Sequence, residues 1–436
     1  MKELVYIIGL LSTLAALILH RRKEALLFLI SFYFVFTVGW IFYRFTGIFM
    51  YDMPILALFF YGLIQGKRFQ FYLRGVSLVF ILFLIWMLVT AIPAQNPGWA
   101  LAEFSKFLRG YIVFVCFANL VRTRRDYQVI LLGLGSGLVL EFILAVWQWR
   151  IGMPPLGFLN LSYHRWRATG TFYVPHYLGN YLVLLLPIFI RLAMFYRART
   201  RRENIKYAIL SGCGLLTFLV SLARGPWVAF GTSMAIMFIL SMGQNKLKPR
   251  IRWTFSVFLA LGGIFLLHYL STIQAQFGDD RKDAFDVRFD QIRVSRRIIA
   301  DRFLLGTGMG NYHLVSYDYL TSTERQEWRA RQYAYMVHNS YLYITAEMGV
   351  PGGILFILTL LKFFYIGLRG IRTNDLFSIN LIVGIMTGLL GICVAFMAGP
   401  DIRSEQLIVQ MYMGGGIMYS LLPSKKSSRH TVTRRL

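Results

Sequence analysis

The fold is decided by uninterrupted apolar runs, of which residues 76–92 are a clear example: VSLVFILFLIWMLVTAI. As a helix, a run of this length can cross a hydrocarbon core of roughly 30 Å. Residues 253–270 and 379–398 have the same character. Backbone exposed to lipid must form its hydrogen bonds internally, and the polar–apolar alternation of a lipid-facing barrel is absent. The sequence therefore predicts an all-α polytopic membrane protein.

The composition of the whole chain agrees with this class. Of 436 residues, 57% are hydrophobic and only 15% are charged, whereas a soluble domain has about 25% charged residues. Mean hydropathy is +0.55. The cysteines Cys116, Cys213 and Cys393 lie far apart within apolar runs. They indicate small packing residues rather than metal ligands or a disulfide set.

The net charge of +26 would suit a nucleic-acid-binding protein, but the basic residues are not placed for that role. They cluster in short links between apolar runs, at 21–23, 67–68, 122–125, 197–206, 246–252, 369–372 and 425–435. Membrane proteins concentrate Lys and Arg in cytoplasmic links in this way. We therefore interpret these links as cytoplasmic and expect no nucleic-acid partner.

Thirteen apolar segments are candidates for crossing the membrane. They are residues 4–19, 25–43, 47–65, 76–93, 108–121, 128–149, 172–194, 207–222, 227–242, 253–271, 340–365, 378–399 and 406–422. The first is short and the third contains Asp52, so we expect about 12 transmembrane helices, with 12 and 13 both open. The first segment lacks a small-residue cleavage site before Arg21, and we expect it to be retained.

The pattern divides the chain into four parts. Residues 1–271 are predicted to form a transmembrane helical bundle, 272–337 a large non-cytoplasmic loop, 338–422 the C-terminal transmembrane helices, and 423–436 a basic cytoplasmic tail. The loop contains nine of the 20 acidic residues together with ten basic ones, so it is near neutral, unlike the basic links. Loops of this length usually have a function.

Part of this loop is expected to be helical. Ile292, Ile298, Ile299 and Phe303 recur at helical spacing, which predicts an amphipathic helix over 287–303. The helix should end near the glycines of 306–310. These glycines are a weak phosphate-binding signal, because no strand precedes them.

Basic side chains are predicted to meet on the non-cytoplasmic face: His338, Arg224 and the arginines of 288–302, with Arg167 as a fourth candidate. A single arginine at a helix end more commonly extends to lipid headgroups. The hypothesis of a functional site therefore rests on the combination of these residues on one face. Arg224 lies in a very short link and cannot leave the membrane border, where a cation is costly unless it meets an anion. A guanidinium suits a phosphate. We therefore predict a site for a lipid-linked phosphate or diphosphate.

The chemistry follows from such a ligand. A sugar on a lipid diphosphate needs neutralisation of the departing charge and a nucleophile relieved of its proton, for which histidine is the usual base near neutral pH. The acidic run 279–290 has no recognisable order of metal ligands and is interpreted as a solvated loop. We therefore expect the arginines to stabilise the leaving group, with no metal and no cofactor.

Four stretches resemble the bacterial O-antigen ligases, within the superfamily of O-antigen polymerases and protein O-oligosaccharyltransferases. The first is Ala168-Thr169-Gly170-Thr171-Phe172. The second is Ser221-Leu222-Ala223-Arg224-Gly225, which departs from the family's turn at Ala223, where serine is frequent. The third is 301–312, DRFLLGTGMGNY. The fourth and most specific is His338-Asn339, nine residues, then Gly349 and Gly352.

The resemblance implies a metal-independent, inverting glycosyltransferase in the bacterial inner membrane, with its active site on the periplasmic face. It implies undecaprenyl diphosphate-linked O-antigen as donor and lipid A–core oligosaccharide as acceptor, among membrane lipids. His338 matches the family's essential histidine. Arg224 matches the turn arginine and Arg288 is the best match for the loop arginine, although Arg293, Arg296 and Arg297 compete. Arg167 and Arg293 are further diphosphate-binding candidates, with Asn339, Gly349 and Gly352 in support.

Two alternatives remain open from the sequence. A polymerase or a protein-glycosylating enzyme of the same superfamily would differ only in its acceptor. A secondary transporter, the more distant alternative, should show paired repeats and ionisable groups near the bilayer midplane. No clear repeat is present, and Asp52, Glu141 and Glu347 are scattered.

Overall fold

The computed structural model describes residues 2–35, 39–43, 46–66, 69–73, 75–151, 167–172, 174–196, 201–242, 282–326, 336–373 and 375–422. The expected segment 253–271, the link 246–252, part of the acidic run 279–290 and the basic tail 423–436 lie outside these residues. Statements about the structure below refer to the described residues.

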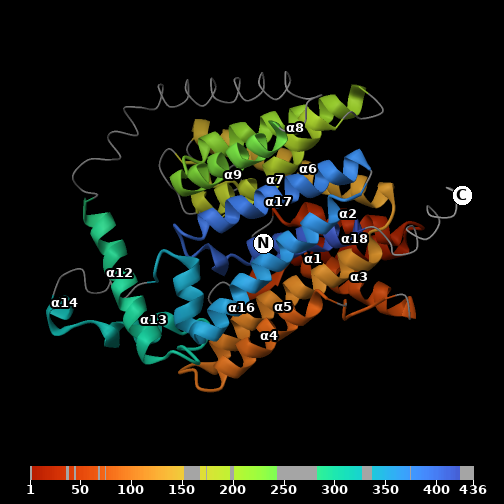
Figure 1. Ribbon diagram of the computed structural model, residues 1–436. Coiled ribbons are helices and arrows are strands. Elements are labelled where there is room, and N and C mark those ends of the chain that lie inside the picture. Colours follow the sequence, from red (N-terminus) through yellow and green to blue (C-terminus); the bar gives the residue numbers. More distant parts are fainter. Residues whose placement is uncertain are drawn as a thin grey trace, which may run out of the picture.

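The described chain is mainly helical, as predicted. Its helices are α1 (Lys2–Ile18), α2 (Arg22–Tyr33), α3 (Asp52–Ile64), α4 (Ser77–Ala91), α5 (Pro97–Leu120), α6 (Arg124–Ile151), α7 (Pro175–Phe195), α8 (Arg201–Val220), α9 (Arg224–Met242), α12 (Lys282–Asp301), α13 (Tyr312–Val315), α14 (Ser322–Gln326), α16 (Ser340–Gly370), α17 (Leu376–Ala395) and α18 (Glu405–Ser420), with 3₁₀ turns η4 (Ser316–Tyr319) and η5 (Asp401–Arg403). The long helices form a bundle, and α12 and α14 project to one side of it (Figure 1).

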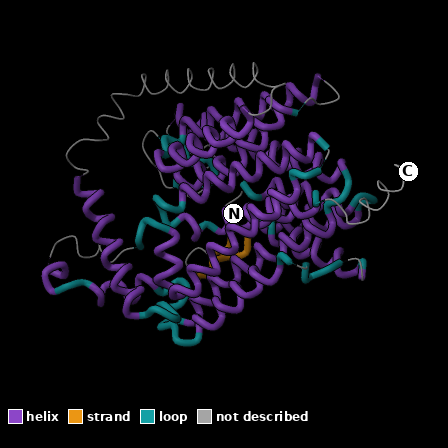
Figure 2. Tube along the Cα trace, viewed as in Figure 1, coloured by secondary structure: helices purple, strands orange, loops and turns teal. Residues whose placement is uncertain are grey.

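A small hairpin corrects the prediction near the N-terminus. Strands β1 (Gly39–Tyr43) and β2 (Thr46–Phe49) pair antiparallel between α2 and α3 (Figure 2). The expected helical segments 25–43 and 47–65 are therefore wrong at their facing ends. Residues 39–49 are rich in aromatic and β-branched types, which favour strands over helices.

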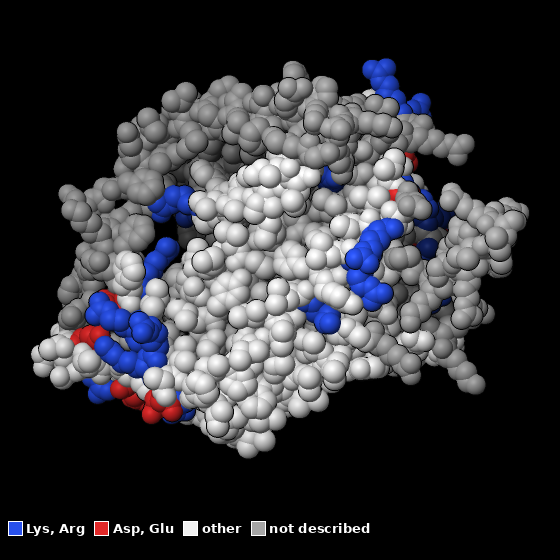
Figure 3. Space-filling model, viewed as in Figure 1, with Lys and Arg blue, Asp and Glu red and all other residues white. Residues whose placement is uncertain are grey.

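The surface of the bundle is that of a multi-pass membrane protein. By length and composition, α6, α7, α16 and α17 can each cross a membrane, and α3 and α4 are shorter apolar helices. Large apolar side chains are exposed along α4 and α16, among them Leu78, Leu82, Ile354 and Leu361. Figure 3 shows a broad uncharged area over the middle of this face, with basic side chains toward its right and a cluster of charged side chains at the lower left. The count of 12 crossings stays a prediction.

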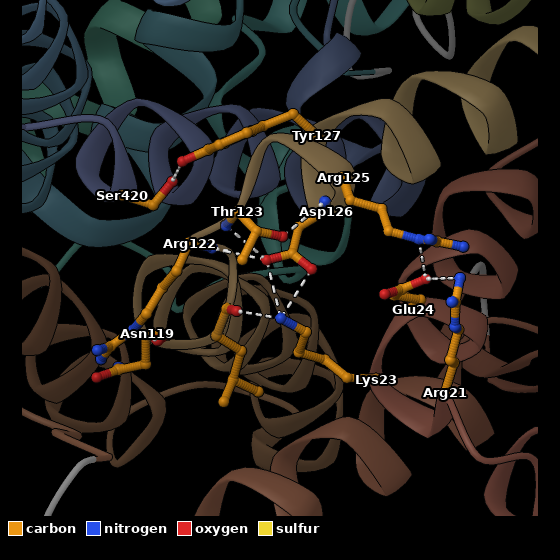
Figure 4. A network of polar contacts seen from close by, with 11 residues as sticks. Arg21, Lys23, Glu24, Asn119, Arg122, Thr123, Arg125, Asp126, Tyr127 and Ser420 are labelled. Atoms are coloured by element: carbon orange, nitrogen blue, oxygen red, sulfur yellow. Dashed lines mark hydrogen bonds and ion pairs between the residues drawn. The ribbon is translucent and has the colours of Figure 1, made fainter.

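The basic links 21–23 and 122–125 lie together at one end of the described bundle, here called the basic end. Lys23, in the first turn of α2, pairs with Asp126 at the start of α6, with 2.7 Å between Nζ and Oδ1. Arg124 donates a hydrogen bond to Tyr196 at the end of α7 (2.6 Å), and the Tyr127 hydroxyl meets Ser420 in α18 (3.0 Å). Figure 4 shows part of this network. The alternation of basic and non-basic links predicted from the sequence corresponds to two opposite ends.

The opposite end, called the site end, contains the expected functional residues. The link between α4 and α5 reaches the loop after α12 there, because the Asn96 amide donates to Asn311 Oδ1 (2.7 Å). The start of α16 reaches the α17–α18 link, since the Ser340 amide donates to the Phe396 carbonyl (2.7 Å). The non-basic links therefore gather around one region.

Helix α16 is broken near its middle, and the loop after α12 fills the break. Gly349 adopts φ 69° and ψ 177°, a conformation that L side chains rarely adopt. The freed backbone groups are bonded across the break: the Thr307 amide donates to Ala346 O (3.1 Å), the Gly308 amide to Glu347 O (2.8 Å), and the Val350 amide to Phe303 O (2.8 Å).

Replacing Gly349 by alanine should destabilise the protein. A Cβ at this position would lie 2.1 Å from the Leu304 carbonyl oxygen, so the positive φ and the clash should together cost at least ~1–3 kcal/mol. Thermal unfolding of the purified protein in detergent measures the effect. Gly212→Ala in α8 is the matched control, because a Cβ there meets nothing within 4 Å. Equal melting temperatures for the two variants would contradict this account of the break.

Candidate functional site

His338 lies immediately before α16, and its imidazole faces α12. Its Nδ1 is 2.8 Å from Gln291 Oε1, and Gln291 is itself buried. An amide oxygen accepts a hydrogen bond, so this contact favours the neutral tautomer that carries its proton on Nδ1 and its lone pair on Nε2. The contact therefore leaves Nε2 as the basic atom of the neutral ring.

The surroundings of His338 keep the ring neutral. Burial lowers the pKa of His338 below its usual value of 6.5, and the positive charge of Arg288 lowers it further, while the Met336 backbone acts weakly in the opposite direction. Arg288 lies one helical turn before Gln291, so both side chains project from the same side of α12. The charge of Arg288 therefore acts on His338, while the expected binding of a diphosphate by Arg288 stays a prediction.

The start of α16 is fixed firmly. Asn339 caps the helix, with its Oδ1 accepting from the Leu342 amide at 3.0 Å, as Asn commonly does at this position. Ser340 is fully buried; its hydroxyl donates to the Gly399 carbonyl (2.7 Å) and accepts from the Ile402 amide (3.3 Å). Asn339, a predicted supporting residue, therefore positions the backbone that carries His338.

The α12 arginines differ in what they bind. Helix α12 confirms the predicted amphipathic helix, with Val294 and Ile298 buried, but Phe303 is 54% exposed, so its expected place on the buried face is wrong. Arg293 pairs with Asp290 at 2.5 Å. Arg297 binds Glu324 through two contacts of 2.7 and 3.1 Å, and this pairing lowers the pKa of Glu324 to about 2. Arg288 is exposed and is the arginine that acts on His338.

Arg167 contacts the turn that precedes Arg224. Arg224 is the exposed first residue of α9, directly after a turn in which Leu222 adopts φ 48°. Arg167 Nε donates to the Ser221 carbonyl in this turn (3.4 Å), and the Ala168 amide donates to the Val220 carbonyl (3.0 Å). The neighbouring residues His164, Arg165 and Trp166 lie outside the described chain.

The start of α7 links these two positions. Gly179 packs so closely that a Cβ there would lie 2.8 Å from Pro226 and 3.2 Å from Ala223, both in the Arg224 region. One turn earlier, His176 Nε2 lies 3.8 Å from Asp401 Oδ1 in the α17–α18 link. That link is the one held by Ser340. A chain of contacts therefore runs from the turn before Arg224, through the start of α7 and the α17–α18 link, to the start of α16 beside His338.

The sequence analysis did not identify three residues that the structure places here. Gln291 sits on the predicted amphipathic helix, but only the fold reveals its contact with His338. Arg403 contacts the Met336 sulfur, and its guanidinium lies 5.9 Å from the centre of the Tyr343 ring. His176 meets Asp401 only through tertiary contacts. In the sequence, the charged residues at 401–405 stand directly before an apolar run. This pattern could have indicated charged side chains at a membrane border.

The glycine loop 306–310 is structural. Besides its bonds to the α16 break, its last residue, Gly310, donates its amide to Glu347 Oε2 (2.8 Å), and the Tyr312 amide donates to Oε1 (3.0 Å). Gly349 allows the break, and Gly352 leaves space beside Met348 and Trp86. These amides already have partners, so anion binding at this end depends on side chains.

The fold and site define a mainly helical, multi-pass membrane protein with cationic side chains and a half-buried histidine at one end of its bundle. Residues 208–357 match a family model described as O-antigen ligase. The match runs from α8 to α16 and contains Arg224, Arg288 and His338. This region of the chain is thus similar to the O-antigen ligases, the family that the sequence resembles. No curated protein sequence matches the chain.

The charge of Arg288 should be visible in the pH dependence of any reaction that needs neutral His338. Arg288→Gln removes a cation that lowers the pKa of His338, so this pKa should rise and the loss of activity at acid pH should begin at higher pH than in the wild type. Wild-type activity should fall only below pH ~6.5.

The measurement is the maximal rate from about pH 5 to pH 8 at saturating substrate. Arg296→Gln is the control, because Arg296 is exposed on α12 and is not among the charges that act on His338. An acid limb that does not move in Arg288→Gln would show that His338 does not titrate in catalysis.

Proposed function

We propose that this protein is an O-antigen ligase. It moves O-antigen from undecaprenyl diphosphate to a sugar hydroxyl of lipid A–core, with inversion and without a metal ion, at the periplasmic face of the bacterial inner membrane. The observation that carries the proposal is the His338–Gln291 contact beside Arg288, within the region that matches the O-antigen ligases.

His338 is the base in this reaction. The acceptor hydroxyl donates its proton to Nε2 as its oxygen attacks the anomeric carbon from the face opposite the diphosphate. The bond between that carbon and the diphosphate oxygen breaks, and its electron pair leaves with the diphosphate. Gln291 accepts from Nδ1–H and keeps the lone pair of Nε2 available. A lowered pKa keeps the ring neutral, and therefore basic, near pH 7.

The arginines stabilise the leaving group. Charge accumulates on the diphosphate as the bond breaks, and cations already in position stabilise it without reorganisation. Arg288 and Arg224 are exposed at the site end and are the principal candidates, with Arg167 beside the Arg224 turn. Arg293 is the weaker candidate, because its ion pair with Asp290 must be shared or broken.

The lipid parts of both substrates have apolar surfaces to follow. The polyprenyl tail and the lipid A anchor enter from the bilayer, along the exposed apolar side chains of helices such as α4 and α16 (Figure 3). Exposed apolar residues at the site end, Phe303, Leu304 and Ile92, lie where the loop after α12 meets the bundle. Their place suits contact with the outer leaflet.

His338→Ala should reduce transfer by ~10²–10⁴-fold, the usual effect of removing a general base. The assay incubates purified protein with lipid-linked O-antigen and lipid A–core and measures the ligated product. His313→Ala is the matched control, a histidine at the same end that stacks on Trp99 with 4.8 Å between ring centres. Full transfer by His338→Ala would refute the proposed role.

The acceptor decides between the members of the superfamily. Lipid A–core should be glycosylated, whereas a second donor glycan and a pilin protein should not. Extension of the glycan on its own carrier would identify a polymerase, and glycosylation of the pilin an O-oligosaccharyltransferase. Solute uptake into liposomes without donor lipid would instead support a transporter.

A further inference from the structure

A second histidine at the site end is paired with a buried acid. His176 follows Pro175 at the start of α7 and is 45% exposed, whereas Asp401 is 5% exposed. Their Nε2 and Oδ1 atoms lie 3.8 Å apart. Nothing in the reaction as described above uses this pair.

The carboxylate of Asp401 is held in place by close packing. A Cβ on residue 399 would lie only 2.7 Å from Asp401 Oδ2, so this packing requires the glycine at 399. Burial raises the pKa of Asp401 to about 7, and the neighbouring Asn180 side chain, one helical turn after His176, opposes this rise. The buried Asp401 carboxyl therefore changes its protonation state near neutral pH.

The pair lies between the two cationic positions of the site. On one side, α7 packs through Gly179 against Ala223 and Pro226, next to Arg224. On the other, Asp401 belongs to the link that Ser340 binds, two residues after His338. The start of α7 therefore lies between the Arg224 turn and the link bound by Ser340.

The acid and the imidazole together can hold one proton in two ways. Either Asp401 is a neutral acid beside neutral His176, or a carboxylate faces an imidazolium. A nearby anion favours the second arrangement, because it attracts the positive ring. The proton then moves from Asp401 to His176 and none is taken from solvent. The exposed ring thus becomes cationic when an anion is present.

We propose that His176, supported by Asp401, is a further diphosphate-binding residue that holds the donor head group between Arg224 and Arg288. This inference rests on the proposed function and adds a residue to the donor side of the site. His338 deals with the acceptor hydroxyl, and His176 deals with the leaving diphosphate. The two histidines therefore have different substrates, which a kinetic experiment can separate.

The experiment uses the full-length protein with His176→Gln, His176→Arg and Asp401→Asn, and with His313→Gln as the control. Two quantities are measured: KM for donor and for acceptor, and the Kd of inorganic pyrophosphate by calorimetry. Loss of a charge-assisted contact should raise the donor KM and the pyrophosphate Kd by ~10–100-fold in His176→Gln. The acceptor KM should not change.

The other variants distinguish charge from structure. His176→Arg keeps a cation opposite Asp401 and should restore most of the pyrophosphate affinity. Asp401→Asn should weaken it, because the imidazolium loses its counter-charge. Unchanged donor KM and Kd in His176→Gln, or equal losses in His176→Gln and His176→Arg, would overturn the inference.

The pyrophosphate measurement also separates this inference from the proposed function. If wild-type protein transfers no glycan to lipid A–core, the ligase proposal fails, but the comparison of pyrophosphate Kd values still decides whether His176 binds a diphosphate. If His176→Gln is not monodisperse on gel filtration, the test uses His176→Arg and Asp401→Asn. A pyrophosphate Kd of Asp401→Asn equal to that of the wild type would overturn the role of the pair.

Discussion

The buried carboxylate of Glu347 holds the site end together. It is fully buried and accepts from the Gly310 and Tyr312 amides, while the backbone on either side of Gly349 binds residues 303–308. A broken helix would otherwise expose unsatisfied carbonyls. Because α12 leads directly into this loop and touches His338 through Gln291, α16 holds the loop at two points. These two attachments, at the α16 break and at His338, hold α12 and its Arg288 in place beside His338.

Charges inside the site end are arranged in pairs. Lys106 Nζ lies 2.8 Å from Glu103 Oε1 and 3.5 Å from the Arg403 carbonyl, and Arg109 bridges Asp52 in α3 and Glu405 in α18. Buried ions are costly unless each has a partner. These pairs add little net stability, but removing one partner would leave a buried charge. They fix how α3, α5 and α18 meet beneath the site.

Much of the helical fold followed from composition and spacing. Long apolar runs such as 76–92 and 128–149 correspond to α4 and α6, because length and lack of charge suffice to specify such helices. The hairpin at 39–49 was missed because a short apolar run does not distinguish strand from helix. At the candidate site, the sequence and its family resemblance singled out His338, Arg288 and Arg224, and their roles stay predictions. Gln291 and the His176–Asp401 pair were not, since only tertiary packing brings them together.

The ion pairs of the α12 arginines could likewise be predicted from the sequence only in part. Asp290 and Arg293 are three residues apart on one helix, so their pairing could be read from the sequence. Arg297 and Glu324 come together only because the loop folds back. The occupied amides of 306–310 have a further consequence. On the proposed function, an anion at this end would be recognised by separate side chains rather than by a rigid backbone cradle. Single substitutions could then adjust head-group preference without rebuilding the loop.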